Sequence, residues 1–234
     1  MEIEKYAQKY IHFYDEDIED DVLIKYLICT KWSSLLDCGC GDGSLLYALQ
    51  KNNFLKDKKV YAIDLSKNRV ARVIKNIKNV SAYVDNAEKM ATIADQSIDF
   101  FISTKVIEHV NDKEMIKAVK RVTKTGSIIY ISTLFKKKWG WYFHRNNGMW
   151  VIDPTHLREY TSDEQLLNLF SKDEFEVLEN IKKPILFSLI DFFIRKLGVK
   201  DNKIYFSFLK YLKFFKIPVP GYYSWTVVLR RKKI

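Results

Sequence analysis

Residues 35–44 read Leu35-Leu36-Asp37-Cys38-Gly39-Cys40-Gly41-Asp42-Gly43-Ser44, and this run is the most informative part of the chain. An apolar strand ends in an acid, glycine then recurs at every second position, and a helical pattern opens at Leu45. Glycine adopts positive φ and has no Cβ, so this backbone can turn tightly and approach a ligand closely. Ligands of open parallel sheets bind at the carboxyl ends of strands, where such a turn lies. The stretch therefore predicts a cofactor-binding turn.

Other interpretations of these glycines fit less well. A phosphate-binding P-loop needs a Lys-Ser/Thr pair that this turn lacks, and a dinucleotide turn needs G-x-G-x-x-G where this chain has G-x-G-x-G. A tight turn without any ligand would explain the glycines. It would not explain the acid two residues before the first of them.

More strands that end in polar residues follow. Residues 60–64 form an apolar run that ends in Asp64, ahead of a basic helix, and residues 81–84 and 97–103 read as two further strands. An acid about twenty residues past a glycine turn can bind ribose hydroxyls, although Asp64 could instead stabilise the start of the following helix. Strand, acid and helix in repeated order predict an α/β fold with a doubly wound parallel sheet.

The pattern Asp-x-Gly-x-Gly-x-Gly resembles the first motif of the class I S-adenosylmethionine-dependent methyltransferases. Later segments resemble the motifs of the type 11 branch, which typically has Gly-Asp-Ala-Glu after the third strand and Glu-His-Val nine residues past an acid in the fourth. This chain has Asp85-Asn86-Ala87-Glu88, then Asp99 and Glu108-His109-Val110. Asn86 stands where the family has its adenine-binding acid. Its carbonyl can accept the same hydrogen bond, or Asp85 takes over that role.

The resemblance covers roughly residues 30 to 182 and implies a single methyltransferase domain over residues 1–234. The expected fold is a Rossmann-like, seven-stranded, mostly parallel sheet whose last strand is antiparallel. The expected parts are N-terminal lid helices (1–32), a cofactor-binding core (33–183), a basic amphipathic helical insertion or cap (184–218) and the last strand (219–234). Strand six is expected over 175–181 and the last strand over 222–230. In the lid, Tyr6, Tyr10 and Phe13 share one helical face, which could equally be ordinary packing.

The resemblance also implies a cofactor, a reaction and site residues. The cofactor is S-adenosylmethionine, and the reaction is methyl transfer to an oxygen or nitrogen of a small-molecule, glycan or lipid-linked acceptor. The implied cofactor-binding residues are Asp37, Gly39, Gly41, Gly43, Asp64, Leu65, Asp85, Asn86, Ala87, Ser103 and Lys105.

Two histidines are the candidate catalytic residues. His109 follows the fourth strand, and His156 lies in a run that resembles the family's His-x-Arg-x-Tyr-Thr element. Imidazole titrates near neutral pH and can act as a base, but either ring could instead order its loop by hydrogen bonding. Because the methyl donor supplies the hard chemistry, we expect no metal site. Cys29, Cys38 and Cys40 are expected to be small packing residues of a reduced compartment.

The connection that contains His156 is unusual. Residues 134–160 read as a long aromatic and basic loop, and loops of that length are commonly functional. At its end, Thr161 is a fitting N-cap for the next helix, with Glu164 completing a capping box.

Positive charge is concentrated at the C-terminal end. Residues 182–234 hold thirteen of the 39 Lys and Arg residues and two acids, a net charge of +11, whereas residues 1–181 carry −1. We expect amphipathic helices over 185–197 and 203–216, the second with a stripe formed by Lys203, Lys210, Lys213 and Lys216. Their faces could cap the domain, dock on an anionic membrane or hold RNA phosphates. An RNA methyltransferase and a catalytically silent membrane adaptor are therefore alternative functions.

Composition and hydropathy indicate where in the cell the protein is expected. It has 234 residues with 47% hydrophobic content, which suits one large domain with a packed core. Residues 1–21 are charged throughout and show no signal peptide, and no run of eighteen apolar residues could span a membrane. A cytoplasmic protein, free or peripheral on a membrane, is expected.

Overall fold

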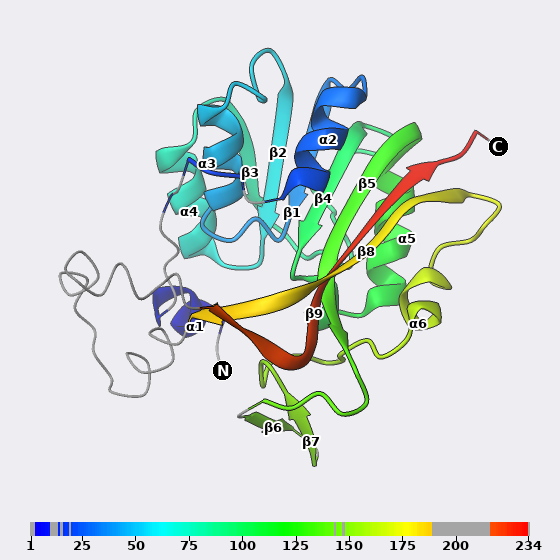
Figure 1. The fold of residues 1–234 in the computed structure, drawn as a ribbon. Coiled ribbons are helices and arrows are strands. Elements are labelled where there is room, and N and C mark those ends of the chain that lie inside the picture. The colour runs from blue at the N-terminus through cyan, green and yellow to red at the C-terminus, as the bar shows by residue number, and fades with distance from the viewer. Residues whose placement is uncertain are drawn as a thin grey trace.

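The computed structural model describes residues 3–9, 14, 16–18, 20–142, 144–146, 148–188 and 216–233. A seven-stranded sheet in the order β3-β2-β1-β4-β5-β9-β8 forms its centre (Figure 1). β9, the last strand, runs antiparallel to both of its neighbours, and the strands from β3 to β5 pair in parallel. The predicted doubly wound sheet is thus confirmed. The strands are β1 (Ser34–Cys38), β2 (Lys59–Asp64), β3 (Val80–Val84), β4 (Ile98–Thr104), β5 (Thr123–Lys136), β8 (Phe175–Ser188) and β9 (Lys216–Arg231).

Helices cover both faces of the sheet (Figure 1). One hydrophobic cluster packs α2 (Asp21–Cys29), α3 (Ser44–Lys51) and α4 (Lys67–Asn76) on one face. A second cluster packs α5 (Asp112–Val122) and α6 (Asp163–Leu167) on the other. The chain leaves β1 for β2 on one side, and β4 lies on the other side of β1. The carboxyl ends of β1 and β4 therefore border the crevice in which doubly wound folds bind ligands.

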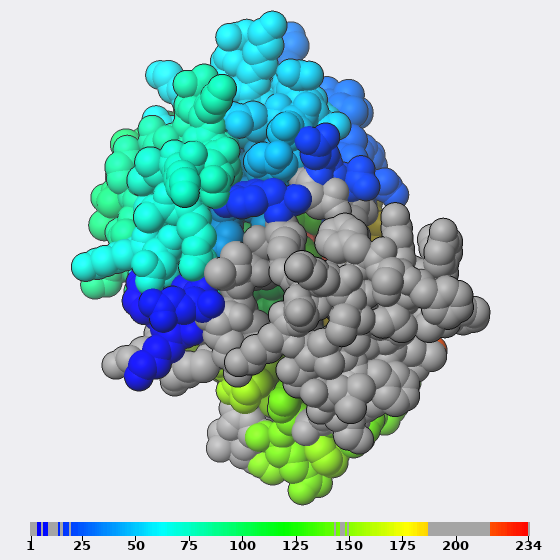
Figure 2. Space-filling model, turned by 90° about the vertical axis from the view of Figure 1, so that its left-hand side faces the viewer, coloured from blue at the N-terminus to red at the C-terminus, as the bar shows by residue number. Residues whose placement is uncertain are grey.

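The first helix lies against the start of α4. α1 (Ile3–Lys9) contributes Glu4, whose carboxylate accepts hydrogen bonds from Ser66 Oγ and the Lys67 amide. Arg72 of α4 donates in turn to the Ala7 carbonyl, and the space-filling view shows α1 directly against α4 (Figure 2). These hydrogen bonds hold α1 next to the end of β2. The rest of the predicted lid face, Tyr10 and Phe13, lies outside the described residues.

The C-terminal expectations need correction. β8 continues to Ser188 and β9 already begins at Lys216, so residues 185–188 and Lys216 are strand and not helix. Periodicity does not separate a short apolar run in a strand from one in a helix. Pro184 fits because β8 is an edge strand, where a missing amide costs no ladder bond. The remainder of the two predicted helices, residues 189–215, lies outside the described residues.

Two further expectations differ locally. The predicted loop 134–160 starts later, because β5 reaches Lys136, and it contains a small hairpin of β6 (His144–Asn146) and β7 (Met149–Val151). α6 is capped one residue later than predicted, by Ser162 with Gln165 in the capping box. Gln165 reaches back to the amides of both Thr161 and Ser162, which displaces Glu164 from that role.

The helices of the described part of the chain are too short or too polar to cross a bilayer, so none is a candidate membrane span.

Asp99 ties β4 to the entry of β1. Its carboxylate accepts hydrogen bonds from the amides of Ser33 and Ser34 and pairs with Lys124 at 2.8 Å. Burial alone would raise the pKa of Asp99, but the hydrogen bonds from Lys124 and Ser33 hold it well below its usual range. The ionised carboxylate therefore stabilises the folded chain. That contribution is complete above the unfolded-state pKa of about 4 and is lost as pH falls through the folded-state value.

We predict that Asp99→Asn lowers the free energy of unfolding by about 1.5–3 kcal/mol at pH 7, the range for hydrogen bonds to a charged group. Urea unfolding at several pH values measures the change, and the gap to wild type should narrow at acidic pH. The matched control is Asp95→Asn, since Asp95 is 71% exposed in its ion pair with Arg121. It should cost no more than about 1 kcal/mol. Equal losses in the two variants would contradict this role of Asp99.

Candidate functional site

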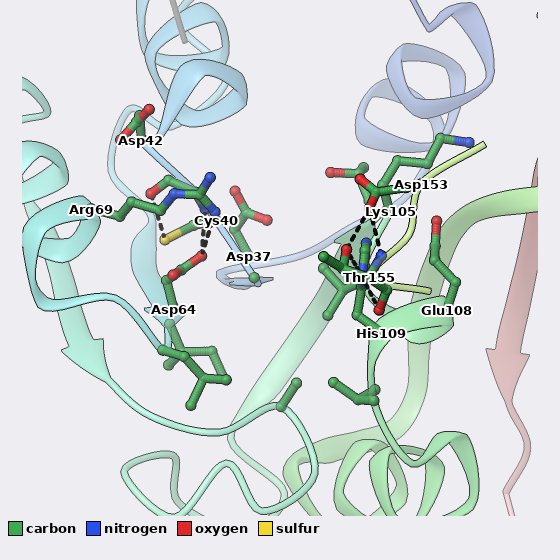
Figure 3. A pocket seen from close by; sticks show the side chains of 18 of the residues that line it. Asp37, Cys40, Asp42, Asp64, Arg69, Lys105, Glu108, His109, Asp153 and Thr155 are labelled. Atoms are coloured by element: carbon green, nitrogen blue, oxygen red, sulfur yellow. Dashed lines mark hydrogen bonds and ion pairs between the residues drawn. The ribbon is translucent and has the colours of Figure 1, made fainter. Parts of the chain in front are cut away.

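A cavity of about 860 Å³ opens at the carboxyl ends of β1, β2 and β4. That volume lies in the range of small-molecule sites. Two groups of side chains face each other across it (Figure 3). The glycine-turn group is Asp37, Cys40, Asp42, Asp64 and Arg69, and the histidine group is Lys105, Glu108, His109, Asp153, Thr155 and His156.

The three glycines of the turn have different roles. All have positive φ, between 55° and 83°. A Cβ on Gly39 would collide with Val106, and one on Gly43 would lie 2.6 Å from Ile77 Cδ1, so these two glycines permit packing inside the protein. A Cβ on Gly41 would meet no atom of the described residues within 4 Å. Gly41 therefore leaves open space on the cavity side, as a ligand-facing glycine should.

Asp64 fixes the shape of the turn. Its Oδ2 accepts a hydrogen bond from the Gly41 amide at 3.0 Å, and its Oδ1 accepts one from the Ser66 amide at 2.9 Å. Arg69 lies 3.8 Å from the same carboxylate. Since Ser66 is the N-cap of α4, Asp64 supports the helix start and also lines the cavity. Its predicted contact with ribose hydroxyls stays a prediction.

Asp37 lacks a partner on one side. It is 1% exposed, and its Oδ1 makes no hydrogen bond among the described residues. Burial, and then the nearby charge of Asp64, raise the pKa of Asp37 to about 7. A buried carboxylate oxygen without a partner is costly. Its place in the cavity fits a ligand that supplies a hydrogen-bond donor or a positive charge.

In the motif Asp85-Asn86-Ala87-Glu88 that follows β3, the first two residues lie in different surroundings. Asp85 lines the cavity, while its carboxylate accepts from the Thr92 amide and hydroxyl. Asn86 does not line the cavity, and its Oδ1 accepts from the Glu88 amide within a local turn. Position thus favours Asp85 over Asn86 for contact with an adenine ring, whose binding here stays a prediction.

Most of the residues expected from the sequence gather in this cavity. Those that line it are Asp37, Gly39, Gly41, Asp64, Leu65, Asp85, Ala87, Lys105, His109 and His156. Gly43, Asn86 and Ser103 do not line it. Gly43 faces α4, and Ser103 is fully buried with an unpartnered hydroxyl.

The histidine group joins two distant segments. Glu108 and His109 lie on a short 3-10 helix (Ile107–His109), and the Glu108 carbonyl accepts from the Leu157 amide at 2.9 Å. This contact brings His156 beside His109, with 4.7 Å between the ring centroids. Glu108 is fully buried, and its Oε2 accepts from Thr133 Oγ1 at 2.9 Å.

Each ring is oriented through its Nδ1. The Nδ1 of His109 lies 3.4 Å from the Thr155 carbonyl, and that of His156 lies 3.1 Å from the Glu159 carboxylate. A carbonyl or carboxylate oxygen only accepts, so each Nδ1 is a donor and carries a proton. Burial, opposed by Glu108 and assisted by His156, lowers the pKa of His109. A neutral ring at pH 7 follows, which is the form that accepts a proton.

Lys105 has an unusual backbone. Its φ of 56° is uncommon for a residue with a side chain. Its Nζ donates to the Thr133 carbonyl at 2.5 Å and to Ser224 Oγ at 3.1 Å. Burial lowers the pKa of Lys105 to about 8. The loop after β4 is thus held in a strained shape beside the cavity, as is common at functional sites.

Several residues that line the cavity were not predicted from the sequence. Glu108 stands inside the Glu-His-Val motif, so its position was available although no role was given to it. Asp153 and Thr155 belong to the turn that holds His109, and Asp153 accepts from the Thr155 amide and hydroxyl. Arg69 lies within an ordinary basic helix, and no local pattern separates it from its neighbours.

We predict that Gly41→Ala abolishes binding of S-adenosylmethionine, because the new methyl group occupies the open space of the turn. Gly126→Ala is the matched control. Gly126 also has positive φ and open space around a Cβ, but it does not line the cavity. Both variants carry the same backbone strain, so they should lose similar stability. Titration calorimetry should show binding for Gly126→Ala and none for Gly41→Ala, and equal affinities would refute a ligand-facing Gly41.

Comparison with known proteins agrees with this geometry. Residues 36–131, from the glycine turn to β5, match the model of the family described as methyltransferase domain. None of the curated proteins matches the chain.

Solved structures share the fold. An S-adenosylmethionine-dependent methyltransferase from Aquifex aeolicus is 17% identical, with 93% of this chain and 90% of that chain covered and a TM-score of 0.53. BH2331 of Bacillus halodurans, a candidate methyltransferase, is 16% identical, with coverages of 91% and 98% and a TM-score of 0.62. The [4+2]-cyclase SpnF is 19% identical, with coverages of 92% and 79% and a TM-score of 0.59. At these identities the likeness shows the fold alone.

The region that matches the family model contains the residues that form the glycine-turn side of the cavity. The matched region holds the open glycine turn, the acid that shapes it and the unpartnered Asp37, and its cavity has room for a nucleoside-sized ligand. These features fit a cofactor that carries positive charge and ribose hydroxyls. Residues 36–131 thus match a methyltransferase domain, and S-adenosylmethionine is the cofactor that this match implies.

Proposed function

We propose that this enzyme transfers the methyl group to an oxygen or nitrogen of a small-molecule, glycan or lipid-linked acceptor. The observation that carries the proposal is the position of the two histidines. His109 lies opposite the glycine turn (Figure 3), and His156 lines the same cavity with its ring centroid 4.7 Å from that of His109. An acceptor between the two groups would have a base on one side and the cofactor on the other.

The proposed role of His109 follows from the position of its ring proton on Nδ1, which leaves Nε2 free to accept another. When bound, the cofactor supplies an electrophilic methyl group, and an acceptor oxygen or nitrogen that gains it must give up a hydrogen. The neutral His109 ring can take that proton at Nε2, since the Thr155 carbonyl holds the proton of Nδ1. A positioned base of this kind typically accelerates a reaction by about 10²–10⁴-fold.

Apolar side chains beside the histidines support an acceptor with an apolar part. Val110, Leu134 and Ile152 line the cavity on this side, together with Tyr142. Such surfaces exclude water from the reacting atoms and bind carbon-rich groups. They favour a small or lipid-linked acceptor over a nucleic-acid strand, which would need a charged groove along its backbone.

We predict that wild-type protein moves the tritiated methyl group of S-adenosylmethionine into small-molecule, glycan or lipid fractions of a cell extract. His109→Gln should lower the rate by about 10²-fold or more through loss of the base, with unchanged calorimetric binding of the cofactor. His144→Gln is the control, because His144 lies on β6 and does not line the cavity. Label found in RNA alone would contradict the proposed acceptor class, and equal rates in the two variants would contradict the role of His109.

We also propose that the basic C-terminal segment meets an anionic membrane surface, which would bring a lipid-linked acceptor to the cavity. The charge of +11 over residues 182–234 supports this partner. In the described part of the segment, Lys183 and Lys216 are exposed on the same two strands as Leu186 and Ile217, which are 54% and 48% exposed. Basic residues next to exposed apolar ones suit the surface of an anionic bilayer.

We predict that the protein co-sediments with vesicles that contain anionic lipid and that salt weakens this binding. Lys183→Glu with Lys216→Glu should lower the affinity at least tenfold, at about 1 kcal/mol for each basic residue near the surface. Lys56→Glu with Lys59→Glu, an equal charge change at the amino end of β2, is the control. Equal binding to neutral vesicles, or an equal loss in the two double variants, would contradict a membrane-facing segment.

A further inference from the structure

The strongest unassigned feature of the described residues is the cluster of Glu108, His109 and His156. We propose that these three side chains bind one divalent transition-metal cation. One ligand atom from each of them lies within 4.8 Å of the other two. A cation at the centre of a triangle of that size is at most about 2.8 Å from each atom, and small side-chain rotations reach the usual ~2.1 Å.

The surroundings prepare the two imidazoles as ligands. The Thr155 carbonyl and the Glu159 carboxylate each hold one Nδ1, so Nε2 is the nitrogen left to bind a metal ion. Metal-binding histidines almost always donate their other ring N–H to an oxygen of this kind. The Glu159 carboxylate also accepts from the Ile152 amide at 2.8 Å and from the Tyr222 hydroxyl at 2.9 Å, so it is a fixed acceptor behind His156.

Glu108 supplies the anionic ligand. The side chain is fully buried, and Thr133 donates to Oε2, whereas Oε1 makes no hydrogen bond among the described residues. Buried charges in proteins are paired or coordinate metals. No described cation forms an ion pair with Glu108, so its free oxygen lacks the partner that a metal ion would provide.

The charges around the cluster permit a cation. Lys105 carries the opposing charge, but its Nζ donates to the Thr133 carbonyl and to Ser224 Oγ. Asp153 adds a second carboxylate to the same wall of the cavity. Burial would raise the pKa of Asp153, but hydrogen bonds from Thr155 and the nearby histidines lower it.

The donor set selects the kind of metal. Two imidazoles and one carboxylate suit iron, cobalt, nickel or zinc, whereas magnesium and calcium prefer oxygen ligands alone. Three protein ligands leave open positions, which is the pattern of catalytic rather than structural metal sites. No local pattern predicts this site, because His156 lies 47 residues beyond His109 and only the fold brings them together.

The role of the cation rests on the proposed function. An acceptor hydroxyl in an open position would bind the cation through its oxygen, and its pKa would fall. The O–H bond would break with its proton passing to water, and the oxygen would use the electron pair left behind to bond the methyl carbon. The bond between that carbon and the sulfonium sulfur would break at the same time, with its electron pair left on sulfur. With the cation bound, His109 Nε2 is a metal ligand and water takes the proton, whereas in the metal-free protein His109 is the base described above.

The test uses the full chain, freed of metal with a chelator and then titrated with Co²⁺. Calorimetry should show one ion bound per chain, and visible absorption should report coordination by nitrogen. Glu108→Gln and His156→Gln should each weaken binding by more than about 100-fold, beyond the 10–100-fold effect of changing an outer-shell residue. His144→Gln and Cys40→Ala, the latter lining the cavity, should bind Co²⁺ like wild type. Circular dichroism verifies that each variant is folded.

Absence of Co²⁺ binding, or binding that persists in both ligand variants, would overturn the metal site. Loss of binding in Cys40→Ala would also overturn it, by moving the ion to the thiol. These outcomes are separate from the proposed function. Methyl transfer that survives chelation, with no ion bound, would contradict the metal site and support the proposed reaction. A bound ion without methyl transfer would support the metal site and contradict the proposed reaction.

Discussion

The hydrogen bond from the Gly41 amide to the Asp64 carboxylate is the contact on which the cofactor half of the cavity depends. It joins the turn after β1 to the end of β2, and the same carboxylate supports the first turn of α4. Gly39 and Gly43 let this turn pack against Val106 and α4, and only Gly41 remains open to a ligand. Asp64, which the sequence predicts to contact the ligand, therefore also stabilises the turn.

The second half of the cavity is built independently. The Glu108 carbonyl accepts from Leu157, and Arg158 donates to the Ile107 carbonyl, so the segment that carries His156 is fastened to the 3-10 helix after β4. The two halves meet only because β1 and β4 are neighbours in the sheet. This arrangement lets one wall bind the cofactor while the other varies with the acceptor, as expected of a fold in which loops at the strand ends carry the function.

The sequence predicted the parallel strands and the glycine turn because their signals are local, namely apolar runs, strand-end acids and closely spaced glycines. It was wrong where two patterns overlap. Residues 185–188 are as apolar as a helix face, yet pairing with β9 makes them a strand. Thr161 and Ser162 can both cap α6, and the reach of Gln165 decides between them. The environment of Glu108 could not be predicted, because burial and the approach of His156 depend on contacts between distant segments.

A crystal structure with S-adenosylhomocysteine, the demethylated form of the cofactor, would show whether the cofactor binds between the two groups of side chains. We predict the ribose beside Asp64, backbone contact at Gly41, and the sulfur facing Glu108, His109 and His156. A ligand bound elsewhere, or a sulfur turned away from these three residues, would contradict this prediction.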